Sequence, residues 1–413
     1  MIVKGKDLSV DFLGVHFENP FVLAAAPPTD DLDMVRRGFD AGWAGAVLKT
    51  TSVPENPVNL AYPMMSGMDH AGDRLVAMGN IDLISEHAID VIEARVSALK
   101  KEFGDRRVVI ASIMGGSKPQ WQGLVRRLED AGVDMIECSF SCPQGSMGEE
   151  PGMMLSQSID ATRRVTGWVK EAARRVPVVI KISPQVTSII KSAMAVKEGG
   201  GDGICAANTI PSLMGINVYS KVPHPDVGGV STYSGMSGPA IKNQTLRTLA
   251  EIRRGTGMPI TATGGPASWW DAVECMLVGA TTVQFCTAVM HYGYDILDDL
   301  AEGLAYYLHD MGLDRPAQIV DGSLDRIVDH DALPRHIDPV AWVDERICVR
   351  CDLCHTACRD GGHQAVRLPA SGRTPTVDAR DCVGCALCVN LCPSHAISIR
   401  PRKDVLAAQE ATP

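Results

Sequence analysis

Two runs of cysteines near the C-terminus are the residues whose type and spacing most clearly predict chemistry. Residues 348–358 and residues 382–392 each have the spacing C-x2-C-x2-C-x3-C. Soft thiolate ligands bind iron well, and this duplicated spacing is typical of a pair of [4Fe–4S] clusters. A disulfide framework and zinc ribbons are the alternatives, which the three-residue steps and Pro393 disfavour. The chain is therefore predicted to carry electrons.

The fourth cysteine of each run is expected to bind the cluster of the opposite run, as is usual for this spacing. The expected ligands of one cluster are Cys348, Cys351, Cys354 and Cys392. The expected ligands of the other cluster are Cys382, Cys385, Cys388 and Cys358. Arg359 stands where the first run would have its trailing proline, which is a small departure from the pattern.

Two lysines and a cysteine elsewhere in the chain are also candidates for chemistry. Lys49 and Lys181 lie in apolar segments, where an amine is costly to bury without an anionic partner. Both are therefore candidates to face a bound flavin, with a snorkelling side chain as the alternative. Cys142 stands in the glycine-bearing segment SFSCPQGSMG, where a thiol of ordinary pKa, about 8.5, can donate a proton at neutral pH. A packing role is the alternative for Cys142.

The elements that must position these residues are eight short apolar runs separated by amphipathic stretches. Continuous rather than alternating apolar runs indicate strands of a parallel sheet that is buried on both faces. Eight such strands alternating with helices predict a (β/α)8 barrel of the TIM type, with a doubly wound α/β sheet as the alternative. The predicted strands are residues 21–26, 45–50, 108–115, 135–140, 178–183, 203–208, 259–265 and 282–289.

Two long segments, 51–80 and 214–238, interrupt this rhythm and are predicted to be loops over the C-terminal end of the barrel, where barrels do chemistry. The pattern becomes polar after residue 313. We therefore expect four parts: a barrel over 1–313, a connector over 314–340, a small α+β ferredoxin-like domain over 341–400 and a tail over 401–413.

Glycines and small residues near the last two predicted strands suggest a phosphate site. Gly264 and Gly265 end the seventh predicted strand, and Cys286 and Thr287 lie in the eighth. Barrels commonly build phosphate sites from backbone N–H groups at these positions.

The chain resembles dihydropyrimidine dehydrogenases and, more distantly, dihydroorotate dehydrogenases. The segments that carry the resemblance are NPFVLAAAPPT, LKT, GNIDLISEH, VIASIMG, SCPQGSMGEEPGM, IKISPQVT, ANTIPSLMG, SGMSGPAIK and TATGGPAS, together with the cysteine runs. The resemblance covers nearly all of residues 8–400. It implies an FMN-containing barrel with two [4Fe–4S] clusters on the same chain, which reduces the 5,6 double bond of uracil or thymine.

The resemblance also implies roles for individual residues. Cys142 is implied as the general acid. Substrate contacts are implied for Asn80, Asp82, Ser139, Asn208 and Thr209. FMN contacts are implied for Ala25, Lys49, Thr50, Lys181, Gly235, Gly264, Gly265, Cys286 and Thr287. Ser139 and Gln144 depart from the asparagine and histidine usual in the family, and the loss of a specific hydrogen bond can alter the choice of substrate.

Composition and missing motifs limit the other function classes. The formal charge of −10 argues against nucleic-acid binding, and no run of eighteen apolar residues or signal peptide is seen, so a cytoplasmic location off the membrane is expected. No GxGxxG motif follows an early strand. Electrons are therefore expected from NADH through a FAD-dependent flavoprotein subunit, in a hetero-oligomer. A reductase of another conjugated ring, a dihydroorotate dehydrogenase and a non-catalytic electron-transfer subunit remain alternatives.

Overall fold

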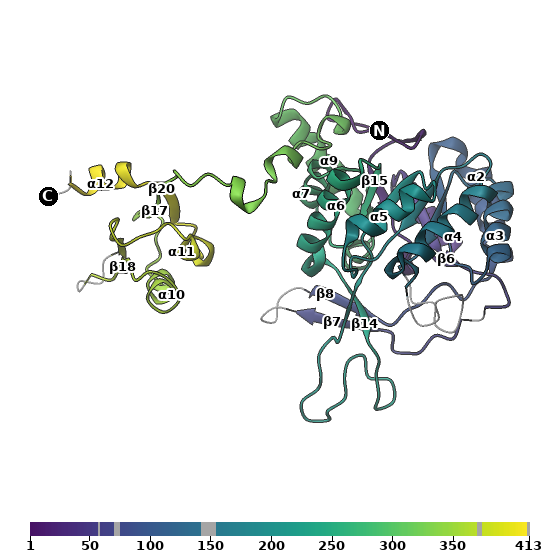
Figure 1. The fold of residues 1–413 in the computed structure, drawn as a ribbon, viewed down its shortest axis with the longest axis horizontal. Coiled ribbons are helices and arrows are strands. Elements are labelled where there is room, and N and C mark those ends of the chain that lie inside the picture. Colours follow the sequence, from purple (N-terminus) through teal and green to yellow (C-terminus); the bar gives the residue numbers. More distant parts are fainter. Residues whose placement is uncertain (57, 70–74, 142–153, 370–373, 411–413) are drawn as a thin grey trace. The chain divides into compact units, whose positions relative to one another are not determined.

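The computed structural model describes residues 1–413 except 57, 70–74, 142–153, 370–373 and 411–413. The chain forms two compact units, residues 1–327 and residues 328–413 (Figure 1). Each unit has a hydrophobic core of its own. Among the described residues, no helix combines the length and the apolar character needed to cross a membrane.

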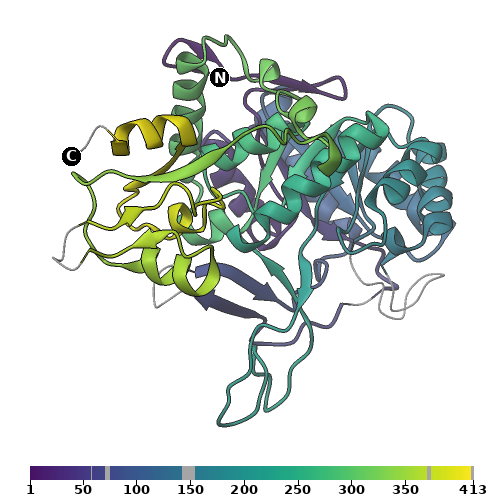
Figure 2. The same ribbon diagram turned by 60° about the vertical axis from the view of Figure 1, so that its left-hand side comes forward.

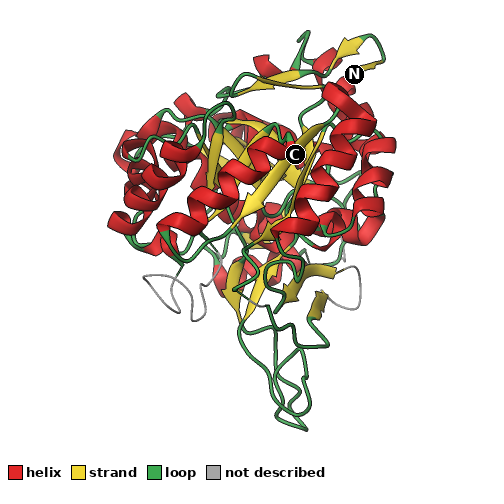
Figure 3. Cartoon of the chain, turned by 90° about the vertical axis from the view of Figure 1, so that its right-hand side faces the viewer, coloured by secondary structure: helices red, strands yellow, loops and turns green. Residues whose placement is uncertain are grey.

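The first unit is a closed barrel of eight parallel strands with helices around its outside (Figure 3). In order around the barrel, the strands are β5 (Phe21–Leu23), β6 (Gly45–Thr51), β9 (Val108–Ile113), β10 (Met135–Ser139), β11 (Val178–Lys181), β12 (Gly203–Ala206), β15 (Ile260–Thr263) and β16 (Ala280–Phe285). Each predicted strand has its counterpart. The (β/α)8 barrel is therefore confirmed, and the doubly wound alternative is wrong.

Local signals explain where the surrounding helices begin and end. The side chains of Ser158, Ser188 and Ser268 accept hydrogen bonds from backbone N–H groups in the first turn of α4, α5 and α7. Gly132 ends α3 in the left-handed conformation, which a glycine adopts at little cost. The helices are α1 (Leu32–Asp40), α2 (Ile89–Phe103), α3 (Lys118–Ala131), α4 (Ile159–Ala172), α5 (Ile189–Glu198), α6 (Lys242–Thr256), α7 (Trp269–Leu277), α8 (Thr287–Tyr292) and α9 (Ile296–Asp310).

Side chains alternate along each barrel strand between the surrounding helices and the barrel interior. In β10, Ile136 belongs to the core shared with the helices, whereas Met135 belongs to a separate cluster that also contains Phe12 and Phe17. These two phenylalanines come from a hairpin that reaches the first residues of β6 and β12, so it closes the N-terminal end of the barrel. The short N-terminal strands are β1 (Ile2–Val3), β2 (Lys6–Asp7), β3 (Val10–Phe12) and β4 (Val15–Phe17).

The two segments predicted to be loops contain strands, so that prediction is wrong in part. Together with a short strand after β12 they form a four-stranded antiparallel sheet, which we call the accessory sheet. The pairing of β14 with β8 joins residues far apart in sequence, such as Asn80 and Gly235, and no local sequence pattern predicts it. Figure 2 shows the long excursion between β13 and β14 extending away from this sheet. The strands are β13 (Ile210–Ser212), β14 (Ser234–Ser237), β8 (Leu75–Asn80) and β7 (Met65–Asp69).

The eighth predicted strand was placed too far along the chain. β16 ends at Phe285 because β5, with which it pairs, ends opposite it at Leu23. The chain then turns at Cys286 into α8, whose first residue is Thr287. Both residues therefore lie at a strand-to-helix turn and not within the strand.

Within its described residues, the second unit combines two short antiparallel strand pairs with three α-helices. The tail predicted from residue 401 is wrong for the described residues, because Pro401 ends a strand and a helix follows. In that helix Val405 is buried, and Arg402 hydrogen-bonds Asp338 at 2.9 Å. The elements are β17 (Pro339–Val343) with β20 (Ile397–Pro401), β18 (Val366–Arg367) with β19 (Thr376–Val377), α10 (Leu353–Gly361), α11 (Leu387–Leu391) and α12 (Arg402–Glu410).

Candidate active site

A cavity of about 410 Å³ lies at the C-terminal ends of the barrel strands. Its walls come from the ends of β5, β6, β10, β11, β12, β15 and β16 and from the accessory sheet. This volume lies in the usual range for a pocket that binds a small molecule or cofactor. The C-terminal end is also where barrels of this type carry their active sites.

The cavity brings together every predicted substrate and FMN residue that the structure describes. Its lining includes Ala25, Lys49, Thr50, Asn80, Asp82, Ser139, Lys181, Asn208, Thr209, Gly235, Gly264, Gly265, Cys286 and Thr287. Cys142, the predicted general acid, and Gln144 lie outside the described residues. The described neighbours of that segment, Ser141 and Met154, both line the cavity.

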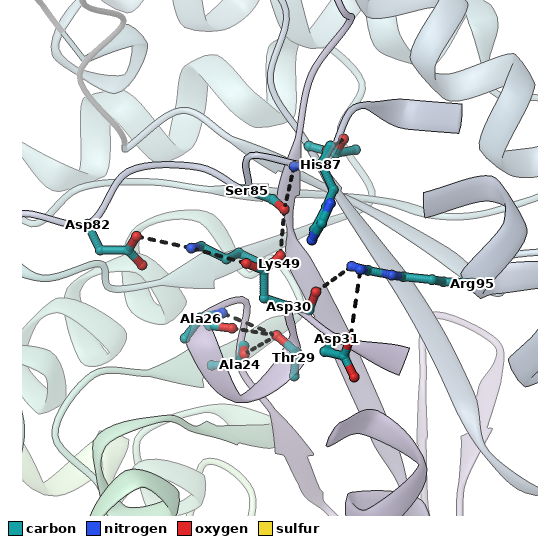
Figure 4. A network of polar contacts seen from close by, with 11 residues as sticks. Ala24, Ala26, Thr29, Asp30, Asp31, Lys49, Asp82, Ser85, His87 and Arg95 are labelled. Atoms are coloured by element: carbon teal, nitrogen blue, oxygen red, sulfur yellow. Dashed lines mark hydrogen bonds and ion pairs between the residues drawn. The ribbon is translucent and has the colours of Figure 1, made fainter. Parts of the chain in front are cut away.

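Lys49 is buried at the end of β6 between two carboxylates (Figure 4). Its Nζ lies 3.0 Å from Oδ1 of Asp82 and 3.4 Å from Oδ2 of Asp30. Asp30 in turn accepts hydrogen bonds from Ser85 and, through its backbone carbonyl, from Arg95. Burial raises the pKa of Asp82 above its usual value, while the charge and the hydrogen bond of Lys49 oppose that rise. This network fixes a cation and a carboxylate side by side in the cavity wall.

Two amide side chains of the cavity are held by backbone carbonyls, that of Asn80 within the accessory sheet and that of Asn208 between β12 and β13. Asn80 Nδ2 donates to the carbonyl of Gly235 at 3.0 Å, and Asn208 Nδ2 donates to the carbonyl of Ser141 at 3.1 Å. A side chain at position 235 would place its Cβ 2.4 Å from Oγ1 of Thr209, so glycine is required for the sheet to approach so closely. Each fixed amide also has a carbonyl oxygen, which can accept a hydrogen bond from a ring N–H.

The ends of β15 and β16 form a compact turn region. Gly264 and Gly265 have φ values of +93° and +106°, which favour glycine. A Cβ at Gly265 would lie 2.7 Å from the backbone nitrogen of Lys242, at the start of α6. Thr287 Oγ1 donates to Ser237 Oγ at 2.9 Å, and burial raises the pKa of the Cys286 thiol to about 11 despite nearby Lys181. The thiol is therefore protonated at neutral pH, and the absence of side chains at Gly264 and Gly265 lets this turn pack closely against Ala207 and Lys242.

Several buried polar residues of this region were missed in the sequence. Ser141 and Ser234 line the cavity and are buried, and neither hydroxyl has a hydrogen-bond partner within the described residues. Gln284 also lines the cavity and donates from Nε2 to Glu137 at 2.9 Å. The sequence does contain a signal for Glu137, because burying its charge in the apolar run of β10 is as costly as burying Lys49 or Lys181. The serines offered no comparable signal.

The eight cysteines of the second unit separate into two groups around two small cavities. One cavity is lined by Cys348, Cys351, Cys354 and Cys392, and the other by Cys358, Cys382, Cys385 and Cys388. This is the division expected from the exchanged fourth cysteine of each run. All the cysteines that the structure describes are free thiols, so the disulfide alternative is wrong for them.

Backbone N–H groups point at several of these sulfur atoms. Cys382 Sγ accepts from Ala341 and from Gly384, both at 3.4 Å. Cys358 Sγ accepts from the N–H of Ala365 at 3.3 Å, and Cys392 Sγ from the N–H of Ala396 at 3.2 Å. Hydrogen bonds of this kind stabilise negative charge on thiolate ligands and tune the potential of an iron–sulfur cluster. The arrangement of the cysteines therefore suits cluster ligands.

Comparisons with known proteins agree with this geometry. Residues 7–308 match the dihydroorotate dehydrogenase family, and residues 341–399 match a 4Fe-4S dicluster domain. Over 400 residues, 95% of each protein, the chain is 37% identical to the NAD-dependent dihydropyrimidine dehydrogenase subunit PreA of Escherichia coli strain K12. Over 314 residues, 73% of each, it is 33% identical to the chloroplastic dihydropyrimidine dehydrogenase (NADP(+)) of Arabidopsis thaliana.

A third relative is the catalytic subunit of dihydroorotate dehydrogenase B (NAD(+)) from Pyrococcus horikoshii. The chain is 30% identical to it over 316 residues, which are 76% of this chain and 96% of the relative. The relatives are oxidoreductases acting on CH–CH groups, and the family predicted from the motifs is confirmed. The chain therefore belongs to the dihydroorotate dehydrogenase family, is an oxidoreductase acting on CH–CH groups, and carries a 4Fe-4S dicluster domain after its barrel.

Proposed function

We propose that this protein is the FMN- and iron–sulfur-containing subunit of a dihydropyrimidine dehydrogenase. It reduces the 5,6 double bond of uracil or thymine, with Cys142 as the general acid. Electrons come from NADH through a FAD-dependent partner subunit and two [4Fe–4S] clusters. The observation that carries the proposal is the cavity that all the described substrate and FMN candidates line, at the C-terminal end of the barrel.

The residues of the cavity fit FMN. The glycines at 264 and 265 and the turn at Cys286 and Thr287 all line the cavity, and backbone N–H groups of such turns would hold its phosphate. The cations of Lys49 and Lys181 lie in the same cavity and suit an anionic ring edge. Bound there, FMN would supply the hydride for one carbon of the substrate double bond.

The chain's own residues would orient the substrate and supply the proton. Asn80 and Asn208 are held by backbone contacts, so each presents an amide in a fixed orientation to the N–H and C=O groups of a cyclic imide. Cys142 directly follows Ser141 in the sequence, and Ser141 lines the cavity. The Cys142 thiol would donate a proton to the second carbon. A thiol protonated at neutral pH suits this role.

The supply of electrons is the part of the proposal that involves a partner. The two groups of four cysteines support two clusters on this chain. The relative from Escherichia coli is named as a subunit, which supports a partner that takes electrons from NADH. A hetero-oligomer of this chain with a FAD-dependent flavoprotein, located in the cytoplasm, follows from the proposal.

Anaerobic turnover with one substrate at a time tests the proposal. The protein is reduced with dithionite, and reoxidation of its flavin is followed after addition of uracil, thymine, a hydantoin, orotate or a cyclic enone. Uracil or thymine should reoxidise the flavin fastest. A reaction with orotate alone would identify a dihydroorotate dehydrogenase, and a reaction with only the hydantoin or the enone would refute the substrate while leaving the fold and cofactors in place.

The role of Cys142 has a separate test with a matched control. Cys142→Ala should retain FMN and lose ring reduction by at least about a hundredfold, the usual contribution of a general acid. Cys275→Ala removes a buried thiol from α7, away from the cavity, and should keep the activity. An active Cys142→Ala protein would refute the acid role, and a reduced flavin that no ring reoxidises in the wild type would support a non-catalytic electron-transfer subunit.

A further inference from the structure

A buried carboxylate, that of Glu137, lies inside the barrel and has no part in the reaction proposed above. Glu137 is two residues before Ser139 on β10, so its side chain has the same inward direction but lies one layer deeper in the barrel. Its exposed fraction is 1%. Ser139 lines the cavity, whereas Glu137 does not. Glu137 therefore sits beneath the cavity floor.

The contacts of Glu137 connect it to two residues that do line the cavity. Gln284 Nε2 donates to Glu137 Oε2 at 2.9 Å, and Lys181 Nζ lies 3.8 Å from Glu137 Oε1. Within the described residues Oε1 accepts no hydrogen bond, and neither does the amide oxygen of Gln284. Cys205 is also adjacent, and burial followed by the charge of Glu137 raises the pKa of its thiol well above the usual value. The thiol is thus neutral, and Lys181 is the cation that faces Glu137 in this layer.

This geometry is poor for a purely structural ion pair. Burial of two charges is repaid only by close contact and by hydrogen bonds to their remaining lone pairs. Here the pair is separated by 3.8 Å, and one carboxylate oxygen accepts no hydrogen bond among the described residues. Glu137 instead acts mainly through its charge. Its carboxylate offsets part of the positive potential of Lys181 at the floor of the cavity, where burial weakens screening by water.

We propose that Glu137 is a positioning residue that orients Lys181 and Gln284 at the cavity floor and whose negative charge would lower the midpoint potential of FMN held in this cavity. The inference rests on the proposed function, because it requires FMN in this cavity. Reduced FMN carries more negative charge than oxidised FMN. A carboxylate close to the cavity would therefore disfavour the reduced form, and removal of its charge would favour that form.

The test is a potentiometric titration of the flavin in the purified holoprotein, with its clusters, in wild type and Glu137→Gln. The substitution preserves shape and removes the charge. We expect the preference for reduced over oxidised FMN to rise at least tenfold, which corresponds to a midpoint potential about 30 mV more positive for a two-electron couple. An unchanged or lower potential overturns the proposal.

Two further variants separate this effect from damage to the fold. Glu129→Gln removes another buried carboxylate, which binds the backbone N–H groups of Arg174, Arg175 and Val176 just before β11. It should lower stability and leave the flavin potential unchanged, and an equal shift in this variant overturns the proposal. If Glu137→Gln does not fold, Glu137→Asp serves instead, because it keeps the negative charge but moves it closer to the β10 backbone. We then expect the midpoint potential to become more positive by a smaller amount.

The proposed function can fail separately from this inference. A wild-type protein that binds no FMN refutes both. A wild-type protein that holds FMN and reduces uracil, together with a Glu137→Gln variant of unchanged potential, refutes only the role of Glu137.

Discussion

Replacement of Gly265 by alanine tests the proposed phosphate end of the FMN site. Gly265 has φ +106°, and a Cβ added there would lie 2.5 Å from Cα and 2.7 Å from the backbone nitrogen of Lys242. Carbon atoms in contact normally lie about 3.5–4.0 Å apart, so the backbone would have to move by about 1 Å. The atoms that would move belong to the first residue of α6, beside the turn that is proposed to hold the phosphate.

Two costs follow, and they can be separated. An alanine at positive φ costs roughly 1–2 kcal/mol of stability, whatever surrounds it. The displaced backbone would in addition lose at least one hydrogen bond to a charged phosphate, worth about 1.5–3 kcal/mol. The second cost reduces FMN affinity, and it corresponds to a dissociation constant that is roughly 10- to 150-fold larger.

The matched control is Gly257→Ala, at the other end of α6. Gly257 also has a positive φ, +68°, but nothing lies within 4 Å of its added Cβ. Quenching of FMN fluorescence by the flavin-free protein measures the dissociation constant, and thermal unfolding measures stability. Both variants should lose stability because of their positive φ, Gly265→Ala more so because of its contact with Lys242, and only Gly265→Ala should lose FMN affinity. Equal FMN affinities in the two variants would refute the assignment of the phosphate site.

Three further outcomes are expected. Burial raises the pKa of Asp82, so at pH values between the unfolded and the folded pKa the carboxyl is protonated in the folded chain and ionised in the unfolded chain. The free energy of unfolding therefore decreases as pH rises through this range. Lys49→Met should raise this pKa further, so the loss of Tm should be larger at pH 7 than at pH 4. Cys358 and Cys382 line the same cavity, so the double variant Cys358→Ala/Cys382→Ala should lose only one cluster, as each single variant does. Cys392 lines the other cavity, so Cys358→Ala/Cys392→Ala should lose both clusters, as measured by iron content and EPR. Ser139→Asn introduces an amide that can both donate and accept a hydrogen bond, and it should raise kcat/KM for uracil by about tenfold or more. An unchanged value would show that Ser139 does not limit pyrimidine binding.

The parts of the molecule that could be predicted from the sequence are those with local signals. The barrel strands were predictable because burial on both faces leaves a continuous apolar run, as in β9 and β10. The division of the cysteines was predictable because their spacing is itself a constraint on cluster ligands. Cys358 and Cys382 stand in different runs and nevertheless line one cavity, as the spacing requires.

The features that escaped prediction depend on contacts between distant residues. Asn80 was expected in a loop, but its position comes from pairing with Gly235, more than 150 residues away. The end of β16 at Phe285 depends on the length of its neighbour β5, which no pattern around Cys286 reveals. Pairings of this kind are set by tertiary contacts, and local propensity does not specify them.

Lys49 and Lys181 both line the predicted site, but for a different physical reason than the one expected from the sequence. They were expected to face a flavin because a buried amine needs an anionic partner. The structure supplies protein carboxylates for both, since Lys49 lies 3.0 Å from Asp82 and Lys181 lies 3.8 Å from Glu137. The need for an anion is therefore met without a cofactor, and the case for FMN rests instead on the cavity that both lysines line.

The same pairing gives the site a property that two unpaired lysines would lack. Two uncompensated cations beneath a flavin would strongly favour its reduced form and hold electrons there. With Asp82 and Asp30 beside Lys49 and with Glu137 beside Lys181, the positive charge of both lysines is offset, and changes in geometry or protonation would move the potential of a bound flavin. Under the proposed function, FMN accepts electrons from iron–sulfur clusters and passes them to a ring, which requires a potential between the two, and we expect Asp82 and Glu137 to influence that potential.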